Sequence, residues 1–189
     1  MKTLPILIFF IFCSVCALGQ SDSSGVFLSM TDFQKRRLTY GCDCKKEKHS
    51  IKVGSLFNNH EIIVTMDGKK TKLKKAELFG YRDCDKKSFR FYNDKEYRVI
   101  SMLRIYMYFT ESEFGTGKSS TIEDRFYFSV SLDSEIIPLT TEHLKEAYPN
   151  NTKFHDLLDS SFRSEAELST FDKYLKKYKL VSIFEESVK

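Results

Sequence analysis

The sequence predicts an α+β fold: an antiparallel β-sheet meander built from hairpins, followed by a short helical C-terminal tail packed on it. Two pairs of β-rich runs flank short turn sequences at Asp67-Gly68 and 93–95. Residues 103–109 alternate in polarity, as a strand with one buried face does. After Thr140 the apolar residues recur at helical spacing instead. Strands followed by helices in one chain are typical of the α+β class.

The first predicted elements are short. Residues 26–28 are predicted as a strand, and Thr31 is placed to cap one or two helical turns over 34–38. Residues 40–48 are predicted as a loop, and this loop carries two of the cysteines.

Two hairpins form the predicted centre of the sheet. An Asp-Gly pair between β-rich runs favours a two-residue turn, because that turn needs positive φ at both central positions. Asn-Asp-Lys offers a similar turn further along the chain. The predicted hairpins pair residues 61–65 with 70–73 and residues 88–92 with 96–100.

The next strands continue the meander. Residues 124–132 are predicted as a strand, and 135–139 as another, with Pro138 at a strand end or sheet edge because proline has no N–H to donate. Within 103–109, the alternation places Ile105, Met107 and Phe109 on one face and Arg104, Tyr106 and Tyr108 on the other.

Three helical segments are predicted in the tail. Ser164 and Glu167 have the spacing of a capping box at the start of the third segment. In that segment the apolar side chains that recur at helical spacing are Leu168, Phe171, Tyr174 and Leu175. The segments are 142–147 after Thr140 or Thr141, 153–159 after Asn151 or Thr152, and 165–178 after Ser164.

Residues 1–19 have the three parts of a secretory signal peptide. Lys2 supplies the positive charge, residues 4–16 are almost continuously apolar, and Ala17-Leu18-Gly19 places small residues before a cut. We therefore expect a secreted or periplasmic protein whose mature chain, 20–189, is a single α+β domain.

Two other interpretations of the leader are disfavoured. A transmembrane anchor needs about 20 apolar residues, which is more than this run provides. Lipidation at Cys13 or Cys16 calls for a small preceding residue, and Phe12 and Val15 stand there instead. No later segment is long and apolar enough to span a bilayer, so we expect no stable membrane insertion after signal cleavage.

The charge of the mature chain argues against nucleic-acid binding. The sequence carries 30 Lys and Arg, of which Lys2 lies in the leader, against 26 Asp and Glu. The remaining slight excess of positive charge is interleaved with acidic residues. The densest basic run, 69–75, is expected to be a solvated sheet edge, because lysines on an edge strand oppose aggregation.

Three cysteines remain in the mature chain, and an oxidising compartment favours one disulfide among them. Cys42 and Cys44 are poor partners, because a bridge across one intervening residue is strained. We expect Cys84 to pair with Cys42 or Cys44, leaving one thiol. The alternative is that all three are reduced and packed.

Several strings resemble a group of small secreted proteins of unknown function from Bacteroidetes bacteria. They are Gly80-Tyr81-Arg82-Asp83-Cys84, Phe89-Arg90-Phe91-Tyr92, and the segment from Pro138-Leu139-Thr140 to Phe154-His155-Asp156-Leu157-Leu158. The resemblance spans most of the mature chain and implies export by a Gram-negative cell. It implies no activity, cofactor or catalytic residue.

No catalytic residue is identified, and neither a cofactor nor a metal is expected. A thiolate at Cys42 or Cys44 near His49 lacks a helix start or signature around it. The Cys-x-Cys pair lacks the second matching pair that such metal sites usually have. The Gly-Lys-Ser within 115–120 lacks the earlier glycine of a phosphate-binding loop, because Ser112 stands there.

The leading hypothesis is a non-enzymatic domain that contacts protein or glycan through an aromatic sheet face, or that serves the cell envelope structurally. Aromatic and arginine side chains on an exposed sheet make good contact surfaces. The alternative is that the helical tail covers this face. The predicted binding residues are Arg104, Tyr106, Tyr108, Tyr97 and Tyr127, with Arg90 as a neighbour.

The second hypothesis is a secreted hydrolase with a dispersed site in the helical tail. His143 and Glu146 are three residues apart, so they share a helix face, although a solvated polar helix face is the favoured explanation of them. The candidate residues for such a site are His143, His155, Asp156 and Glu142. Their convergence in one concave pocket is what this hypothesis requires.

Overall fold

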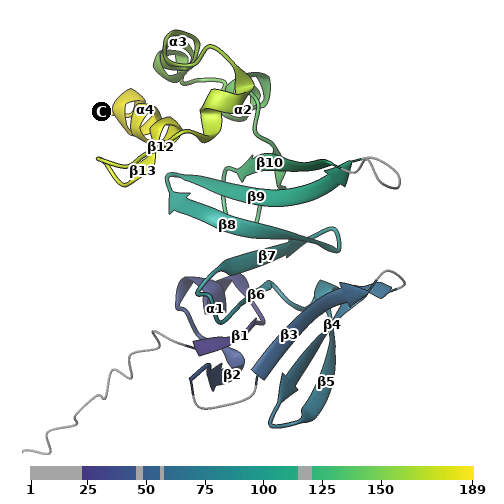
Figure 1. Ribbon diagram of the computed structural model, residues 1–189. Helices are drawn as coiled ribbons and strands as arrows, with labels where there is room; N and C mark the ends of the chain where they lie inside the picture. Colours follow the sequence, from purple (N-terminus) through teal and green to yellow (C-terminus); the bar gives the residue numbers. More distant parts are fainter. Residues whose placement is uncertain (1–22, 46–48, 56–57, 115–120) are drawn as a thin grey trace, which may run out of the picture.

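The structure is a computed structural model that describes residues 23–45, 49–55, 58–114 and 121–189 (Figure 1). The predicted signal peptide and the Gly-Lys-Ser sequence lie outside the described residues, as does the side chain of His49. Among the described helices, none has the length and apolar character needed to cross a membrane.

An eight-stranded antiparallel sheet forms the centre of the fold, in the order β11-β10-β9-β8-β7-β6-β1-β2. Strands β6 to β11 are each neighbours of the next, so this part of the sheet is the predicted meander. The strands are β1 (Ser23–Phe27), β2 (Thr39–Asp43), β6 (Gly80–Arg82), β7 (Ser88–Tyr92), β8 (Lys95–Leu103), β9 (Ile105–Phe114), β10 (Thr121–Ser129) and β11 (Ile137–Pro138).

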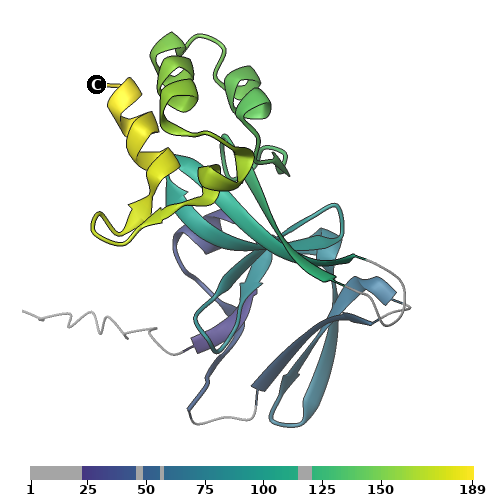
Figure 2. The same cartoon turned by 45° about the horizontal axis from the view of Figure 1, so that its top comes forward.

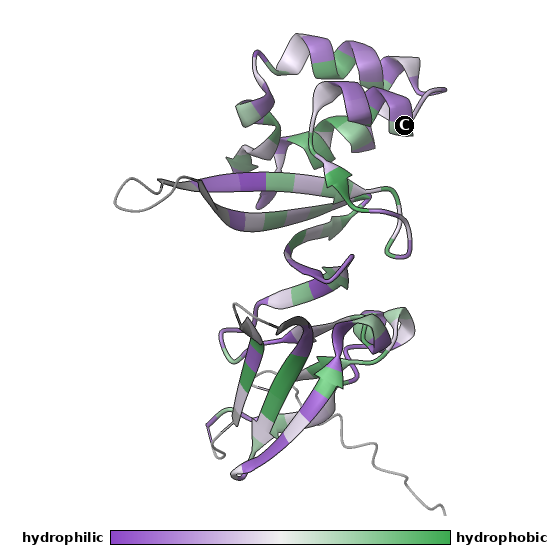
Figure 3. Cartoon of the chain, turned by 90° about the vertical axis from the view of Figure 1, so that its right-hand side faces the viewer, coloured by the Kyte–Doolittle hydropathy of each residue, from purple (hydrophilic) through white to green (hydrophobic). Residues whose placement is uncertain are grey.

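A second sheet of three strands contains the predicted Asp-Gly hairpin. Its strands are β3 (His49–Ser55), β4 (Asn58–Met66) and β5 (Lys69–Lys74), with β4 in the middle. Asp67 and Gly68 both have positive φ, 48° and 78°, as a two-residue turn of this kind requires. Residues 62–64 of β4 are hydrophobic, whereas β5 is mostly hydrophilic (Figure 3). Residues 69–74 of the lysine run form the edge strand β5, as predicted, whereas Lys75 is buried beyond its end.

The second predicted hairpin joins β7 and β8. Its turn is one residue shorter than predicted, because Asn93 and Asp94 alone have positive φ and Lys95 already begins β8. Asn and Asp tolerate this conformation better than other residues with a side chain.

The helical tail packs on the sheet and confirms the α+β class. Its helices are α2 (Thr141–Ala147), α3 (Thr152–Ser161) and α4 (Lys179–Ser187), which Figure 2 shows together at one end of the sheet. The side chain of Thr140 accepts the backbone N–H of His143, and that of Asn151 accepts the N–H of Phe154, so both predicted caps form. The core here combines Ile105, Met107 and Phe128 of the sheet with Leu144, Phe154, Leu158, Leu168, Leu180 and Val181.

The helical tail and the small sheet cover the same face of the large sheet, at opposite ends of it (Figures 1 and 2). Ile62 and Val64 of β4 pack on Val26, Tyr81 and Phe91. The strand register links these residues to the face under the helices through the pairs Tyr81–Phe89, Phe89–Arg98, Arg98–Phe109 and Phe109–Phe126. The strip of sheet between the two covers is the part of this face that they leave accessible.

The first helix begins earlier than predicted. α1 spans Met30–Gln34, and its cap is Ser29, whose hydroxyl accepts the N–H of Asp32 at 3.1 Å. Arg36 has a φ of 53°, which ends the helix before the predicted 34–38 segment can form. The Ser29 hydroxyl and the Arg37 guanidinium bind the Asp32 carboxylate and hold its pKa below the usual value.

The predicted helix over 165–178 is wrong. That segment forms a 3-10 turn, η3 (Glu165–Ser169), and then a hairpin of β12 (Phe171–Asp172) and β13 (Lys177–Tyr178). The Asp172 carboxylate accepts the backbone N–H groups of Tyr174 and Leu175 at 2.8 and 2.9 Å, which stabilises a turn in place of a helix. Lys176 completes the turn with a φ of 52°.

Gly80 allows β6 to lie against β7, and we expect its replacement to be costly. A Cβ at this position lies 1.9 Å from the carbonyl oxygen of Phe89, so Gly80→Ala must displace backbone in the middle of the sheet. We expect a loss of about 3 kcal/mol in the free energy of unfolding, measured by urea denaturation.

Gly68→Ala is the matched control for this variant. A Cβ there meets nothing within 4 Å, so only the positive φ of the turn opposes it. Its expected cost is about 1 kcal/mol. An equal cost for the two variants contradicts the steric argument at Gly80.

Candidate binding cleft

Most of the predicted aromatic face is covered, although not by the helical tail. Tyr108 is fully buried and Tyr106 is half-buried. The cover comes from the segment after β10, through Leu132 and Ile136, and from α1, through Phe33. The tail lies on the opposite face, over Ile105, Met107 and Phe128. Arg104 is exposed at the turn between β8 and β9, apart from the tyrosines.

Arg90 is the centre of a buried polar network under this cover. Its side chain is 4% exposed, and it donates to the Tyr108 hydroxyl at 3.0 Å and to the Ser134 carbonyl at 2.6 Å. The Tyr108 hydroxyl lies 2.9 Å from Ser129 Oγ, which in turn donates to the Ser131 carbonyl. The guanidinium also faces the rings of Phe79, Tyr92 and Tyr108 at 5.6 to 5.7 Å. The network fixes the segment after β10 and is structural.

Tyr97 and Tyr127 line a cleft of about 320 Å³, which we call the tyrosine cleft. Their rings meet edge to face with centroids 5.1 Å apart. Tyr97 is buried and Tyr127 is half-buried, so Tyr127 presents the more accessible ring. The other lining residues are Val53, Lys75, Asp94, Lys95, Glu96, Thr110, Glu111 and Arg125.

A second cleft, of about 360 Å³, adjoins the first, and we call it the arginine cleft. The two share Glu96, Thr110 and Glu111, and we call them together the double cleft. The remaining residues of the arginine cleft are Asp83, Lys87, Phe89, Arg98 and Phe109, which include the strip of sheet between the two covers.

The strand register places two carboxylates at the boundary between the clefts. Arg98 of β8 pairs with Phe109 of β9, and its guanidinium lies 4.4 Å from the centre of the Phe109 ring. Glu96 precedes this pair by two residues on one strand, and Glu111 follows it by two on the other. Both glutamates therefore project on the same face as the pair.

Two phenols around Glu96 have raised pKa values. The Tyr81 hydroxyl donates to Glu96 Oε2 at 2.9 Å, and burial together with the Glu96 charge raises the pKa of Tyr81 above its usual range. Burial also raises the pKa of Tyr97, with a further contribution from Tyr127. Like an ordinary tyrosine, both phenols are protonated at neutral pH, and each hydroxyl can donate a hydrogen bond.

Lys75 is a buried cation that the sequence did not distinguish from the lysine run. It belongs to a 3-10 turn, η1 (Lys75–Glu77), and is 3% exposed. Its Nζ donates to the Asp94 carbonyl at 2.8 Å and lies 5.6 Å from the Phe91 ring centre. Burial lowers the pKa of Lys75, and the nearby Glu96 and Asp94 charges act in the opposite direction.

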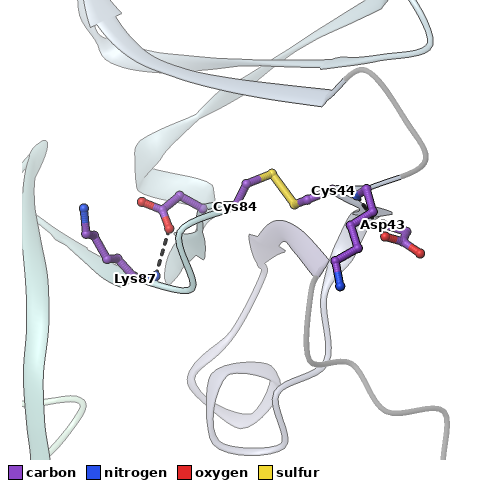
Figure 4. The surroundings of a disulfide bond; sticks show 6 residues. Asp43, Cys44, Cys84 and Lys87 are labelled. Carbon is purple, nitrogen blue, oxygen red and sulfur yellow. Dashed lines mark hydrogen bonds between the residues drawn. A yellow bond between two sulfur atoms is a disulfide. The ribbon is translucent and has the colours of Figure 1, made fainter.

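A disulfide holds one rim of the arginine cleft. Cys44 and Cys84 are bonded, with their Cα atoms 5.7 Å apart (Figure 4), which selects one of the two predicted pairings. Cys42 is buried and keeps its thiol. Next to Cys84, the Asp83 carboxylate accepts the backbone N–H of Lys87 at 2.8 Å and closes the loop that these two lining residues share.

The residues of the hydrolase hypothesis lie apart from the described clefts. His143 Nδ1 is 3.0 Å from the Pro138 carbonyl, and His155 Nε2 is 3.0 Å from the Tyr148 carbonyl. Glu142 and Asp156 are exposed, and none of the four lines the double cleft. Over the described ranges, no group of three or more His, Cys, Asp or Glu side chains could hold a metal ion.

Comparison of the chain with protein-family models, with curated proteins and with solved structures gives no match.

Proposed function

We propose that this protein is an exported, non-enzymatic binding domain that holds a glycan in the double cleft. The observation that carries the proposal is the pair of adjoining clefts that share Glu96, Thr110 and Glu111. The proposal keeps Tyr97 and Tyr127 as contact residues, as in the hypothesis drawn from the sequence. Tyr108 is buried, and the carboxylates of Glu96 and Glu111 take its place as contact groups.

The chemistry of the lining favours a neutral, hydroxyl-rich ligand. The two linings hold carboxylates and cations in nearly equal numbers, so a strongly charged ligand of either sign meets repulsion. Glu96 and Glu111 can accept hydrogen bonds from sugar hydroxyls, while Arg98 and Arg125 can donate to them. The half-buried ring of Tyr127 offers apolar surface for the C–H face of a sugar.

The size of the clefts agrees with this class of ligand. Small-molecule sites usually measure about 300–1,000 Å³, and each cleft lies near the lower limit of that range. Tyr97, Thr110 and Tyr127 project on the face of the sheet opposite Glu96 and Glu111. Because Glu96 and Glu111 line both clefts, a sugar unit in either cleft can contact these carboxylates.

The disulfide supports the export part of the proposal. Such bonds persist in oxidising compartments, including the periplasm and the extracellular space, where glycans of the cell envelope are also found. This agrees with the signal peptide expected over 1–19 and with the resemblance to secreted proteins.

A glycan array with the mature, oxidised protein, followed by calorimetric titration of each hit, tests the proposal. We expect Tyr127→Ala and Glu111→Gln each to weaken binding by about tenfold, since each removes one contact worth roughly 1.4 kcal/mol. The matched controls are Tyr174→Ala, whose ring is 92% exposed outside the cleft, and Glu142→Gln on α2.

The proposal fails if no glycan binds, or if a cleft variant and its control bind alike. Release of sugar products from a bound glycan, abolished by Glu111→Gln, supports a hydrolase in this cleft in place of the binding domain.

A further inference from the structure

Two neighbouring hairpin turns expose large apolar side chains to solvent. The turn between β8 and β9 exposes Met102 and Leu103, and the turn between β12 and β13 exposes Tyr174 and Leu175. Leu103 is 52% exposed and Tyr174 is 92% exposed. Most other aromatic side chains of the described residues are buried or half-buried. Phe171, at the base of the second turn, is also exposed. We call these two turns the apolar tips.

The apolar tips lie side by side. Figures 1 and 2 both show the β12–β13 hairpin beside the turn that joins β8 and β9. Glu185 of α4 connects them, because its carboxylate accepts from Lys177 Nζ of β13 at 2.6 Å and is also stabilised by the charge of Arg104. The exposed side chains of both tips therefore belong to one edge of the molecule.

The second tip is held in its exposed conformation. The Asp172 carboxylate accepts the N–H groups of both Tyr174 and Leu175, and the rings of Phe171 and Tyr178 meet edge to face with centroids 5.2 Å apart. Because the turn is fixed by these contacts, Tyr174 and Leu175 cannot fold back onto the core without breaking them.

Positive charge surrounds the apolar tips. Lys173, Lys176 and Arg104 are exposed there. The nearby acidic groups are already engaged, since Asp172 binds the turn and Glu185 binds Lys177. This edge therefore combines projecting apolar side chains with an excess of positive charge around them.

We propose that this edge docks on the surface of an anionic lipid bilayer. Aromatic and aliphatic side chains favour the boundary between headgroups and acyl chains, and adjacent lysines and arginines bind anionic headgroups. The tips project from the molecule, whereas a stable protein interface needs a complementary area of about 800 Å² on each partner. Protruding apolar tips surrounded by positive charge therefore fit a deformable, negatively charged lipid surface better than they fit the surface of a folded protein.

Bilayer docking leaves the double cleft accessible. Glu96 lies near the start of β8 and Leu103 at its end, which separates the cleft from the tips by about 23 Å along the strand. The inference is therefore independent of what the cleft binds.

Flotation of the mature, oxidised protein with lipid vesicles tests the proposal. We expect binding to vesicles in which about a third of the lipid is phosphatidylglycerol, and no measurable binding to pure phosphatidylcholine vesicles. Tyr174→Ser with Leu175→Ser, and separately Lys173→Glu with Lys176→Glu, should each weaken binding by about tenfold. All four residues are exposed, so circular dichroism should show unchanged folding.

Matched controls lie elsewhere on the surface. Lys70→Glu with Lys72→Glu makes the same charge change on β5, and Val130→Ser removes another exposed apolar side chain. We expect both controls to bind anionic vesicles as the unmodified protein does. Absence of binding to anionic vesicles, equal binding to both vesicle types, or equal effects of tip and control variants overturns the proposal.

Discussion

Replacing Cys44 and Cys84 with serine should lower the free energy of unfolding by about 4 kcal/mol. The disulfide joins residues separated by 40 positions, so breaking it gives the unfolded chain a large increase in conformational freedom. In the folded state, β2 is the last strand of the large sheet and pairs with β1 on one side, so the disulfide ties this edge of the sheet to the loop after β6. The measurement is urea denaturation of the double variant beside the oxidised protein.

Two comparisons isolate the effect of the crosslink. Cys42→Ala removes a buried thiol that is outside the disulfide, and we expect it to cost about 1 kcal/mol. Dithiothreitol should destabilise the unmodified protein by the same amount as the double substitution and should leave the double variant unchanged. If the reductant does not shift the unfolding midpoint of the unmodified protein, this account of its stability is incorrect.

The parts of the fold that the sequence predicts correctly follow from local rules. The turns at Asp67-Gly68 and Asn93-Asp94 were predictable because few residues adopt positive φ readily. The faces of β9 were predictable because side chains alternate along a strand, which places Ile105 and Met107 together in the core. The helix caps at Thr140 and Asn151 follow from side-chain chemistry within three residues.

The predicted helix over 165–178 shows where a local pattern is insufficient. Phe171, Tyr174 and Leu175 match helical spacing, but in the structure all three are exposed, so burial did not select that spacing. The decisive interaction is the Asp172 carboxylate with the N–H groups of the turn, which competes with helical hydrogen bonds. Apolar residues of an exposed hairpin can thus recur along the sequence at the same spacing as the residues on the buried face of a helix.

The candidate site was predicted only in part for a similar reason. Alternation shows which residues share a face, but it does not show what covers that face. Tyr108 is covered by a segment in which only Leu132 and Ile136 supply buried apolar side chains, whereas Tyr127 remains at a cleft. Glu96 and Glu111 were missed because their proximity depends on the β8–β9 register, which the sequence alone does not define.

Replacing Arg90 with methionine should destabilise the protein by about 3–5 kcal/mol, because it removes the centre of a buried network. The substitution leaves the Ser134 carbonyl and the Tyr108 hydroxyl without the donor that binds them now. It also removes the guanidinium from its contacts with the rings of Phe79, Tyr92 and Tyr108. The segment that covers the tyrosine face should loosen, and near-ultraviolet circular dichroism of the tyrosines should report this.

Further variants distinguish the network from simple packing. Arg90→Lys keeps the charge, but a compact ammonium group cannot donate to two partners in the planar geometry of a guanidinium, so we expect it to recover less than half of the loss. In a double-mutant cycle, Arg90→Met and Tyr108→Phe should show a coupling energy of about 1–3 kcal/mol, since their side chains share one hydrogen-bonded network.

Arg98→Met is the control for losing an arginine that lies over a single ring. Arg98 is half-buried, and its guanidinium lies over the ring of Phe109, so we expect a loss of about 1 kcal/mol or less. If Arg90→Met costs no more than Arg98→Met, the network does not hold the cover in place. The burial of Tyr108 then depends on its apolar contacts with Ile136 and Tyr97, and Ile136 becomes the position of the cover whose substitution exposes the Tyr108 ring.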